Sequence, residues 1–150
     1  MSAPDAAVAT VVCDHCGRRN RLPVAARGVP RCGNCHNPLP WIVDADATTF
    51  DAAIDADLPV LVDFWAAWCA PCRMVSPVVE RLGHADAGRL KVVKLDVDGA
   101  PDISARYDVQ GIPLLLLLHH GRELDRLVGA APEAQLRAWV DSQLAAAAQE

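Results

Sequence analysis

Six cysteines in three Cys-x-x-Cys pairs constrain this 150-residue chain more than any other feature of its sequence. Two pairs fall within residues 11–39, a segment rich in Gly, Pro, Arg and Asn, and the third follows an apolar run much later in the chain. Residues 11–39 contain too few large apolar side chains to form a core by burial alone. A metal ion or a cross-link is therefore needed to stabilise that segment.

The first two pairs have the spacing of a four-cysteine zinc site. They are Cys13-x-x-Cys16 and Cys32-x-x-Cys35, with 15 residues between them. We expect the four thiolates to bind one structural zinc ion, because a closed tetrahedral site contributes folding free energy directly and leaves no position for a substrate. Gly17 and Gly33 are expected to supply the backbone freedom that two tight turns need.

Other uses of these four cysteines stay open. They could form two disulfides or a second redox pair, and His15 and His36 could in principle bind metal.

Beyond Leu39 the sequence changes to alternating apolar runs and amphipathic stretches. We therefore expect a zinc knuckle with a short leader over residues 1–39 and a second domain over residues 40–150.

The second domain has the pattern of an α/β fold, in which strands alternate with helices. Four β-rich runs are expected as strands: Val60–Trp65, Lys91–Asp96, Leu114–His119 and Glu123–Val128. Helical spacing predicts two apolar helix faces, one formed by Met74, Val75, Val78, Val79 and Leu82 and the other by Leu136, Trp139, Val140 and Leu144. Pro132 suits the first turn of the last helix, and a turn at Gly121 predicts an antiparallel pair of strands at one edge.

The third cysteine pair, Cys69 and Cys72, directly follows the strand Val60–Trp65 and opens an amphipathic helix. A thiol at the start of a helix faces unpaired N–H groups and the positive end of the helix dipole, so its thiolate is favoured. We expect Cys69 to be the exposed nucleophile and Cys72, one turn later, to resolve a mixed disulfide. Pro71 stiffens the first turn at little cost to the helix.

An acidic residue, Asp63, interrupts the apolar strand that precedes this motif. If the strand is buried on both faces, desolvation penalises the carboxylate and raises its pKa. The alternative is an exposed aspartate at a strand end.

These features resemble the thioredoxin family, and with the knuckle they resemble its zinc-containing, two-domain bacterial members. The resemblance covers residues 11–145 and depends on Val62-Asp63-Phe64-Trp65, the motif Trp68–Cys72, Pro77, Gly111-Ile112-Pro113 and Val128-Gly129-Ala130. It implies a five-stranded mixed sheet flanked by four helices and the activity of a protein-disulfide reductase. Two positions depart from the usual pattern: Ala70 replaces a glycine, which bears on the reduction potential, and Leu114 replaces a threonine, which bears on packing.

The resemblance also implies roles for single residues. Asp63 would be the buried acid that serves Cys72, and Lys94 would pair with it, although an exposed lysine fits the sequence equally well. Pro113 would be a cis-proline beside the disulfide, although an ordinary proline at a strand start also fits. The residues implied for an apolar rim that docks client proteins are Trp68, Ile112, Gly129 and Ala130. Trp65 and Trp139 are expected in the core, and His119-His120 at an exposed strand end.

Charge and hydropathy limit the partners. The net charge of −5 argues against nucleic-acid binding. Five arginines near the first two cysteine pairs are expected to balance an anionic zinc–thiolate cluster: Arg18, Arg19, Arg21, Arg27 and Arg31. No apolar run approaches the roughly 18 residues that span a membrane, and the apolar stretch at the start lacks a basic flank. We expect a cytoplasmic monomer without nucleic-acid or membrane partners.

Three functions compete. The first is a disulfide reductase that acts on client proteins and is regenerated by a thioredoxin reductase using NADPH, a partner implied by the resemblance alone. The second is a redox-sensing binding module or chaperone whose knuckle releases zinc on oxidation. The third, a thiol oxidase or isomerase, requires an oxidising compartment.

Overall fold

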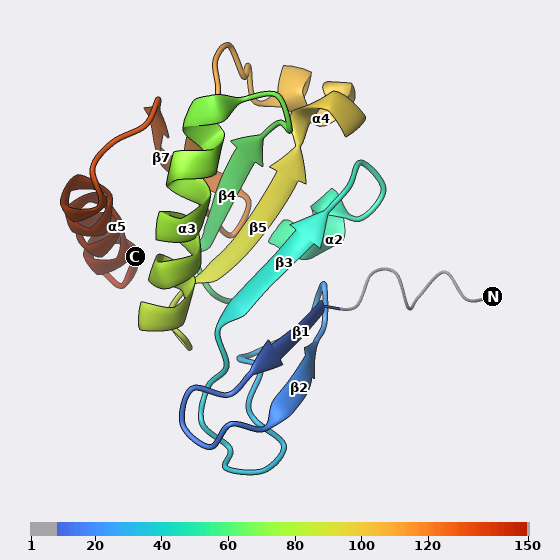
Figure 1. Ribbon diagram of the computed structural model, residues 1–150, viewed down its shortest axis with the longest axis vertical. Helices are drawn as coiled ribbons and strands as arrows, with labels where there is room; N and C mark the ends of the chain where they lie inside the picture. The colour runs from blue at the N-terminus through green and yellow to red at the C-terminus, as the bar shows by residue number, and fades with distance from the viewer. Residues whose placement is uncertain (1–8, 150) are drawn as a thin grey trace.

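The computed structural model describes residues 9–149, which form a two-stranded sheet followed by a five-stranded mixed sheet with helices on both faces (Figure 1). The small sheet pairs β1 (Ala9–Val12) with β2 (Arg19–Leu22) in antiparallel fashion. The large sheet has the order β3-β5-β4-β6-β7. Strand β5 runs parallel to β3 and β4, whereas β6 is antiparallel to β4 and β7. The mixed sheet implied by the resemblance is therefore confirmed.

The predicted strands and helices of the large domain are present, together with one further strand, two further α-helices and a 3-10 helix. The strands are β3 (Trp41–Ala45), β4 (Val60–Trp65), β5 (Lys91–Asp96), β6 (Leu114–His119) and β7 (Arg122–Val128). The helices are α2 (Phe50–Ile54), α3 (Ala70–Ala85), α4 (Pro101–Arg106) and α5 (Glu133–Ala147), with a short 3-10 helix η1 (Val97–Gly99). Three predicted strands match to the residue, and the fourth begins one residue earlier, at Arg122.

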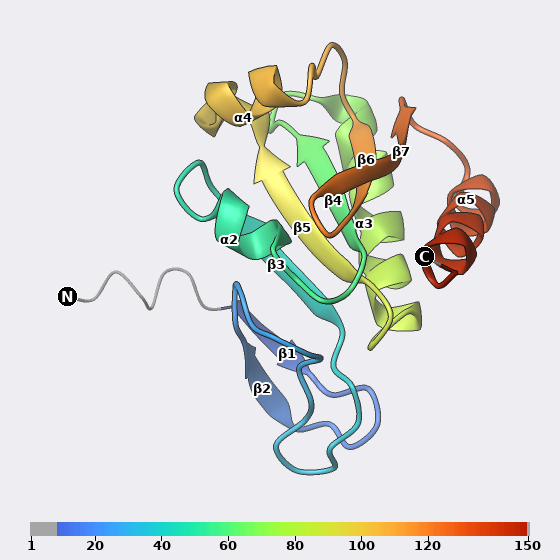
Figure 2. The same cartoon turned by 180° about the vertical axis from the view of Figure 1, so that it is seen from behind.

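Helices α3 and α5 cover one face of the sheet, and α2 and α4 cover the other. The two views show this, because α3 crosses in front of the strands in Figure 1 and behind them in Figure 2. The first five residues of β4 are buried, as expected for a central strand packed on both faces. Among residues 9–149 no helix is long and apolar enough to cross a membrane.

The apolar face predicted for α3 is correct except at Met74. Val75, Val78, Val79 and Leu82 are buried, whereas Met74 is 72% exposed. Each helical residue turns by about 100°, and Met74 therefore lies roughly 40° beyond the stripe that the four buried residues define. In α5, Pro132 caps the helix and does not stand within its first turn, and Trp139 is only partly buried against the core. At the end of β6, His119 is half-buried and His120 is exposed.

The cysteine-rich segment and the large domain share one core. Cys13, Leu22, Cys32 and Leu39 belong to the same hydrophobic cluster as Trp41 and the other apolar residues on the α2 face of the sheet. The indole N–H of Trp41 donates to the carbonyl oxygen of Pro23 at 2.8 Å. The knuckle is therefore packed directly onto the start of β3, and no flexible linker separates the two parts.

A fully buried lysine adds to this contact between the knuckle and the large domain, which we call the joint. Lys91 in β5 is 0% exposed, and its ammonium lies 4.1 Å from the centroid of a Trp41 ring. Its Nζ donates to the carbonyl oxygens of Val24, in the knuckle, at 2.5 Å and of Ala53, in α2, at 2.6 Å. Burial lowers the pKa of Lys91 to about 8, which leaves the ammonium charged at neutral pH. One buried cation thus ties three separate segments together.

We expect Lys91→Met to lower the free energy of unfolding by about 1–3 kcal/mol at pH 7, because two buried carbonyls lose their donor. Between the folded pKa of about 8 and the unfolded value of 10.5, only the unfolded chain retains the lysine proton. The stability of the wild-type protein relative to Lys91→Met should therefore rise with pH across that window. Urea titrations of both proteins at a series of pH values measure this difference.

The matched control is Arg27→Gln, which removes two exposed ion pairs of the same joint, from Arg27 to Asp55 at 2.8 Å and to Asp57 at 3.1 Å. Exposed pairs contribute about 0–1 kcal/mol, so this change should have a small effect without the alkaline component. Equal effects of the two substitutions would contradict the role assigned to Lys91.

Candidate functional site

The third cysteine pair stands where β4 meets α3. After β4 ends, the N–H of Cys69 donates to the carbonyl oxygen of Ala66 at 3.1 Å, and this turn leads into the helix. Cys69 is the N-cap residue, and its Sγ accepts a hydrogen bond from the backbone N–H of Cys72 at 3.2 Å. Pro71 lies in the first turn, where its missing N–H costs nothing. The sulfur of Cys69 therefore occupies the helix end that favours a thiolate.

Cys69 and Cys72 are joined by a disulfide in this structure, with 5.3 Å between their Cα atoms. Both residues are 4% exposed and pack against Ala66, with Trp65 and Ile112 also in contact with the cluster. The predicted difference in exposure between the two cysteines is thus absent in the disulfide form, because the bond draws the sulfur of Cys69 against that of Cys72.

Residues predicted for the client-binding rim line two different pockets. Trp68 is 66% exposed, and its indole N–H donates to Asp98 at 2.9 Å. With Ile112 it lines a pocket of about 360 Å³. Ala130 borders a second pocket, of about 390 Å³, beside the exposed Met74. The structure thus brings Trp68 and Ile112 together and places Ala130 in a separate hollow.

The peptide bond between Ile112 and Pro113 is cis, and Pro113 is buried. Its carbonyl oxygen accepts a hydrogen bond from the N–H of Gly129 at 2.8 Å, and Gly129 has a left-handed backbone with φ of 92°. This bond fixes the end of β7 beside the start of β6. The next residue, Leu114, is 1% exposed, so the side chain that departs from the family pattern is absorbed by the core.

Asp63 is buried in the middle of β4 and is only 2% exposed. Desolvation is the largest cause of a shift that raises its pKa to about 6. The charge of Lys94 opposes this shift, whereas the charges of Glu80 and Asp44 add to it. The carboxyl can therefore exchange a proton close to neutral pH, which an exposed aspartate cannot do.

Lys94 lies opposite Asp63 in the parallel register of β4 and β5, but its ammonium bonds elsewhere. Its Nζ donates to Ser76 Oγ at 2.9 Å and to Glu80 Oε1 at 3.0 Å. Across residues 9–149, no hydrogen bond or ion pair joins Lys94 to Asp63, so the direct pairing that the resemblance implied is not observed. Sequence reasoning missed Ser76 and Glu80, although their i, i+4 spacing marks one face of α3.

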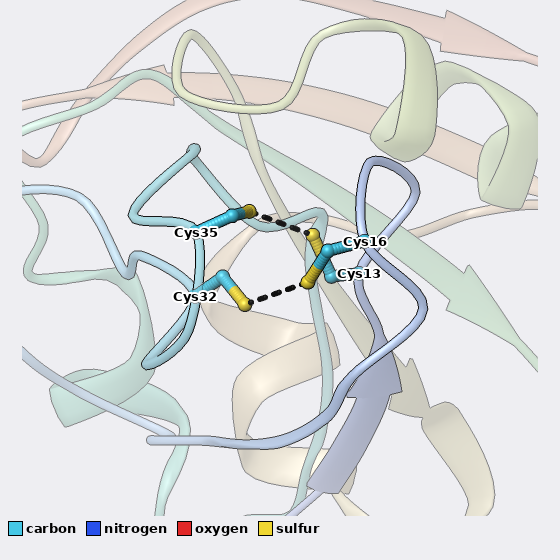
Figure 3. A group of neighbouring side chains, drawn as sticks. All are labelled: Cys13, Cys16, Cys32 and Cys35. Atoms are coloured by element: carbon cyan, nitrogen blue, oxygen red, sulfur yellow. Dashed lines mark hydrogen bonds between the residues drawn. The ribbon is translucent and has the colours of Figure 1, made fainter.

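The four remaining cysteines converge from two loops, as Figure 3 shows. Their Sγ atoms all lie within 4.8 Å of one another. Cys13 Sγ is 3.5 Å from Cys35 Sγ, and Cys16 Sγ is 3.5 Å from Cys32 Sγ. Among the described residues this is the one group of possible metal ligands, and neither His15 nor His36 belongs to it. Four sulfurs in such a cluster suit a tetrahedral zinc ion.

N–H groups beside the second cysteine pair favour the thiolate forms of Cys32 and Cys35. The N–H of Cys35 has the largest effect on Cys32, and with the N–H of Asn34 and the amide of Asn20 it lowers the pKa of Cys32 to about 5. The N–H and the side-chain amide of Asn37 likewise lower the pKa of Cys35. Donors of this kind stabilise the negative charge that metal-bound thiolates retain.

The two cysteine turns have matching backbone hydrogen bonds. Gly17 N–H donates to Cys13 O, and His36 N–H donates to Cys32 O, both at 2.9 Å. Gly17 has φ of 80° and His36 has φ of 66°, so the histidine occupies the left-handed position of the second turn. The prediction that Gly33 supplies this freedom is wrong, because the left-handed residue follows the second cysteine of each pair and Gly33 follows the first. Gly33 instead donates its N–H to Asn20 Oδ1 at 3.0 Å.

Comparison with known proteins agrees with this geometry. A family model described as Thioredoxin matches residues 41–142. The chain is 43% identical to Thioredoxin C-2 of Corynebacterium nephridii over 69% of its own length and 96% of that protein. It is 41% identical to Thioredoxin 1 of a Nostoc species over 66% and 92% of the two chains. Similarity to Thioredoxin C-3 of Corynebacterium nephridii, at 36% identity, covers 89% of this chain and 94% of that protein. It thus extends into the cysteine-rich segment.

The turn geometry gives a matched pair of substitutions. We expect Gly17→Ala to lower the free energy of unfolding by about 1–2 kcal/mol, because a Cβ is strained at φ of 80° even in open space. Gly33→Ala should change it by less than about 0.5 kcal/mol, since its backbone is not left-handed and the new Cβ meets only Asn20 Oδ1 at 3.9 Å. Thermal unfolding of the two variants tests this order, and the reverse order would contradict it.

Proposed function

The chain belongs to the thioredoxin family, and from that premise we propose that it reduces disulfides of client proteins, with Cys69 as the nucleophile and Cys72 as the resolving thiol. Family membership makes the chain a thiol-disulfide oxidoreductase. The observation that carries the assignment of roles is the position of Cys69 as the N-cap of α3, where its sulfur accepts the N–H of Cys72. Cys72 lies inside the helix and lacks that position.

The reaction moves two electrons from the dithiol to the client. The Cys69 thiolate attacks one sulfur of the client disulfide, which forms a mixed disulfide and releases one client thiolate. Cys72 then loses its proton and attacks the sulfur of Cys69, so that the Cys69–Cys72 disulfide forms and the second client thiolate leaves. Both client thiolates take up protons. The protein is oxidised to its disulfide and the client is reduced to a dithiol.

Asp63 is the proposed acceptor of the Cys72 proton. Its carboxyl is buried, and its pKa of about 6 makes it a stronger base than an exposed aspartate. The positive charge of Lys94 lowers the pKa of Asp63 and so favours the carboxylate, the form that accepts a proton. Pro113 has a separate proposed role in client docking. It holds the backbone before β6 beside the site, where an extended client segment can pair with it.

We propose that clients dock on the apolar rim formed by Trp68, Ile112, Gly129 and Ala130. A thioredoxin reductase that uses NADPH is the proposed source of electrons for regenerating the dithiol.

The protein is proposed to act as a monomer in the cytoplasm, where thiols stay reduced. The family match falls on the redox domain, so the alternative of a binding module or chaperone acting through zinc release is not favoured.

We propose further that Cys13, Cys16, Cys32 and Cys35 hold one structural zinc ion. The fit of the four sulfurs and the donors around them supports this ion. When bound, zinc would close the two cysteine turns against each other and stabilise a segment whose few apolar residues depend on the neighbouring domain. A division into a knuckle over residues 1–39 and a redox domain over residues 40–150 follows from this proposal.

Serine substitutions at the two redox cysteines test the proposed function. We expect Cys69→Ser to abolish reduction of a client disulfide, because no thiolate remains at the helix start. Cys72→Ser should still attack but should accumulate as a mixed disulfide, because no second thiol can release the client. Non-reducing electrophoresis and mass spectrometry distinguish the two. Trapping of clients by Cys69→Ser alone would reverse the assignment.

Metal analysis tests the zinc proposal. We expect the reduced, purified protein to contain one zinc per chain and Cys32→Ser to contain markedly less, because only three thiolates remain. The control is Cys69→Ser, which should retain the full amount. A reduced wild-type sample that is free of zinc and has a folded first segment would refute this assignment.

A further inference from the structure

The hydrogen bonds of Lys94 distinguish this site from a simple pair of acid and lysine. The chain has only two lysines, both in β5, and Lys94 is the one on the face of Asp63. Its ammonium is bonded to Ser76 and Glu80 at 2.9 and 3.0 Å. Those two residues stand one turn apart on α3, the helix that begins with the redox pair. The helix that begins at the redox pair is therefore also the element to which the Lys94 ammonium is bonded.

Open space adjoins the Lys94 side chain. Its side chain is only 15% exposed, yet it borders two hollows. One, of about 340 Å³, is also lined by Cys72, Ser76 and Asp44. The other, of about 420 Å³, is lined by Glu80, Asp44 and residues of β1. The ammonium thus borders open space, and its two bonds to α3 hold it in the observed position.

The charges facing Asp63 come from three neighbouring elements. Lys94 faces it from β5, Glu80 from α3 and Asp44 from β3. Within the described part of the chain, the carboxyl has no hydrogen-bond partner that would compensate for its burial. A direct contact with an ammonium would stabilise the carboxylate and make it a weaker base. An ammonium bonded elsewhere exerts only a weaker, longer-range effect.

We propose that Glu80, assisted by Ser76, is a positioning residue for the resolving step, because it holds the Lys94 ammonium away from the Asp63 carboxyl and so preserves Asp63 as the base for Cys72. The inference depends on the proposed function, in which Asp63 accepts that proton. Glu80 touches neither client nor sulfur and acts through the lysine. The attack of Cys69 on a client is independent of it.

The test begins with Glu80→Gln in the full-length, reduced protein. Released from Glu80, Lys94 can move toward Asp63, so the midpoint of the Asp63 titration should fall by about one pH unit, as followed by the NMR signal of its carboxyl carbon. The midpoint of mixed-disulfide resolution in stopped-flow kinetics should fall with it. Resolution at pH 8 should slow about threefold, since a base weaker by about one unit loses roughly half a unit in log rate.

Two controls distinguish an effect that acts through Lys94 from an effect of removing one negative charge. Glu133→Gln also removes one partly exposed carboxylate that pairs with a cation, Arg81, and should leave the Asp63 titration in place. In a Lys94→Met background, Glu80→Gln should shift the midpoint by much less than in the wild type, because no ammonium remains to be released. An equal shift in the two backgrounds would show that Glu80 acts by its own charge, which overturns the proposal.

Asp63→Asn distinguishes failure of the inference from failure of the proposed base. If Asp63→Asn removes the pH dependence of resolution while Glu80→Gln leaves the Asp63 midpoint unchanged, the base stands and the positioning role is overturned. If resolution keeps its pH dependence in Asp63→Asn, the proposed base is wrong and the inference about resolution falls with it. A downward shift in Glu80→Gln that requires Lys94 supports the inference.

Discussion

The redox site depends on one junction, at which the buried strand β4 ends and α3 begins. Burial of β4 between β5 and β6 fixes the strand, and the turn after Trp65 delivers Cys69 to the first N–H groups of the helix. The same strand carries Asp63 beneath the motif, where water is excluded and the carboxyl pKa rises to about 6. In the proposed function, the helix end favours the thiolate of Cys69, and the buried Asp63 accepts the proton of Cys72.

Strand β5 places one lysine on each face of the sheet. Lys91 and Lys94 are three residues apart, so their side chains point to opposite faces. Lys91 joins the knuckle to α2 through two backbone carbonyls, and Lys94 joins the redox helix through Ser76 and Glu80. Burying an ammonium is costly unless hydrogen bonds compensate for lost water. The two lysines therefore act as fixed connectors between segments that are distant in the sequence.

The knuckle has few large apolar residues of its own and shares its core with the redox domain. Its four sulfurs gather within 4.8 Å, and two of its cysteines are buried in a cluster shared with the redox domain. Matching hydrogen bonds in the two cysteine turns put Gly17 and His36 in equivalent left-handed positions. Glycine adopts this conformation most readily, and histidine is among the few other residues that are enriched in it.

The sequence by itself determined four strands of the large sheet, the helices α3 and α5 and the different settings of the cysteine pairs, and it favoured burial of Asp63 over an exposed position. These properties depend on spacing and period, which a chain displays locally: alternation and apolar runs define strands, and Cys-x-x-Cys places two sulfurs on one turn. The roles of the site residues and the division near Leu39 stay predictions. Tertiary structure alone decided that Lys94 bonds to Glu80, that Lys91 bonds to Val24 and that His36 takes the turn position expected of Gly33. Each of these depends on which atoms of another segment come within about 3 Å, and that is set by the packing of whole elements and not by local sequence.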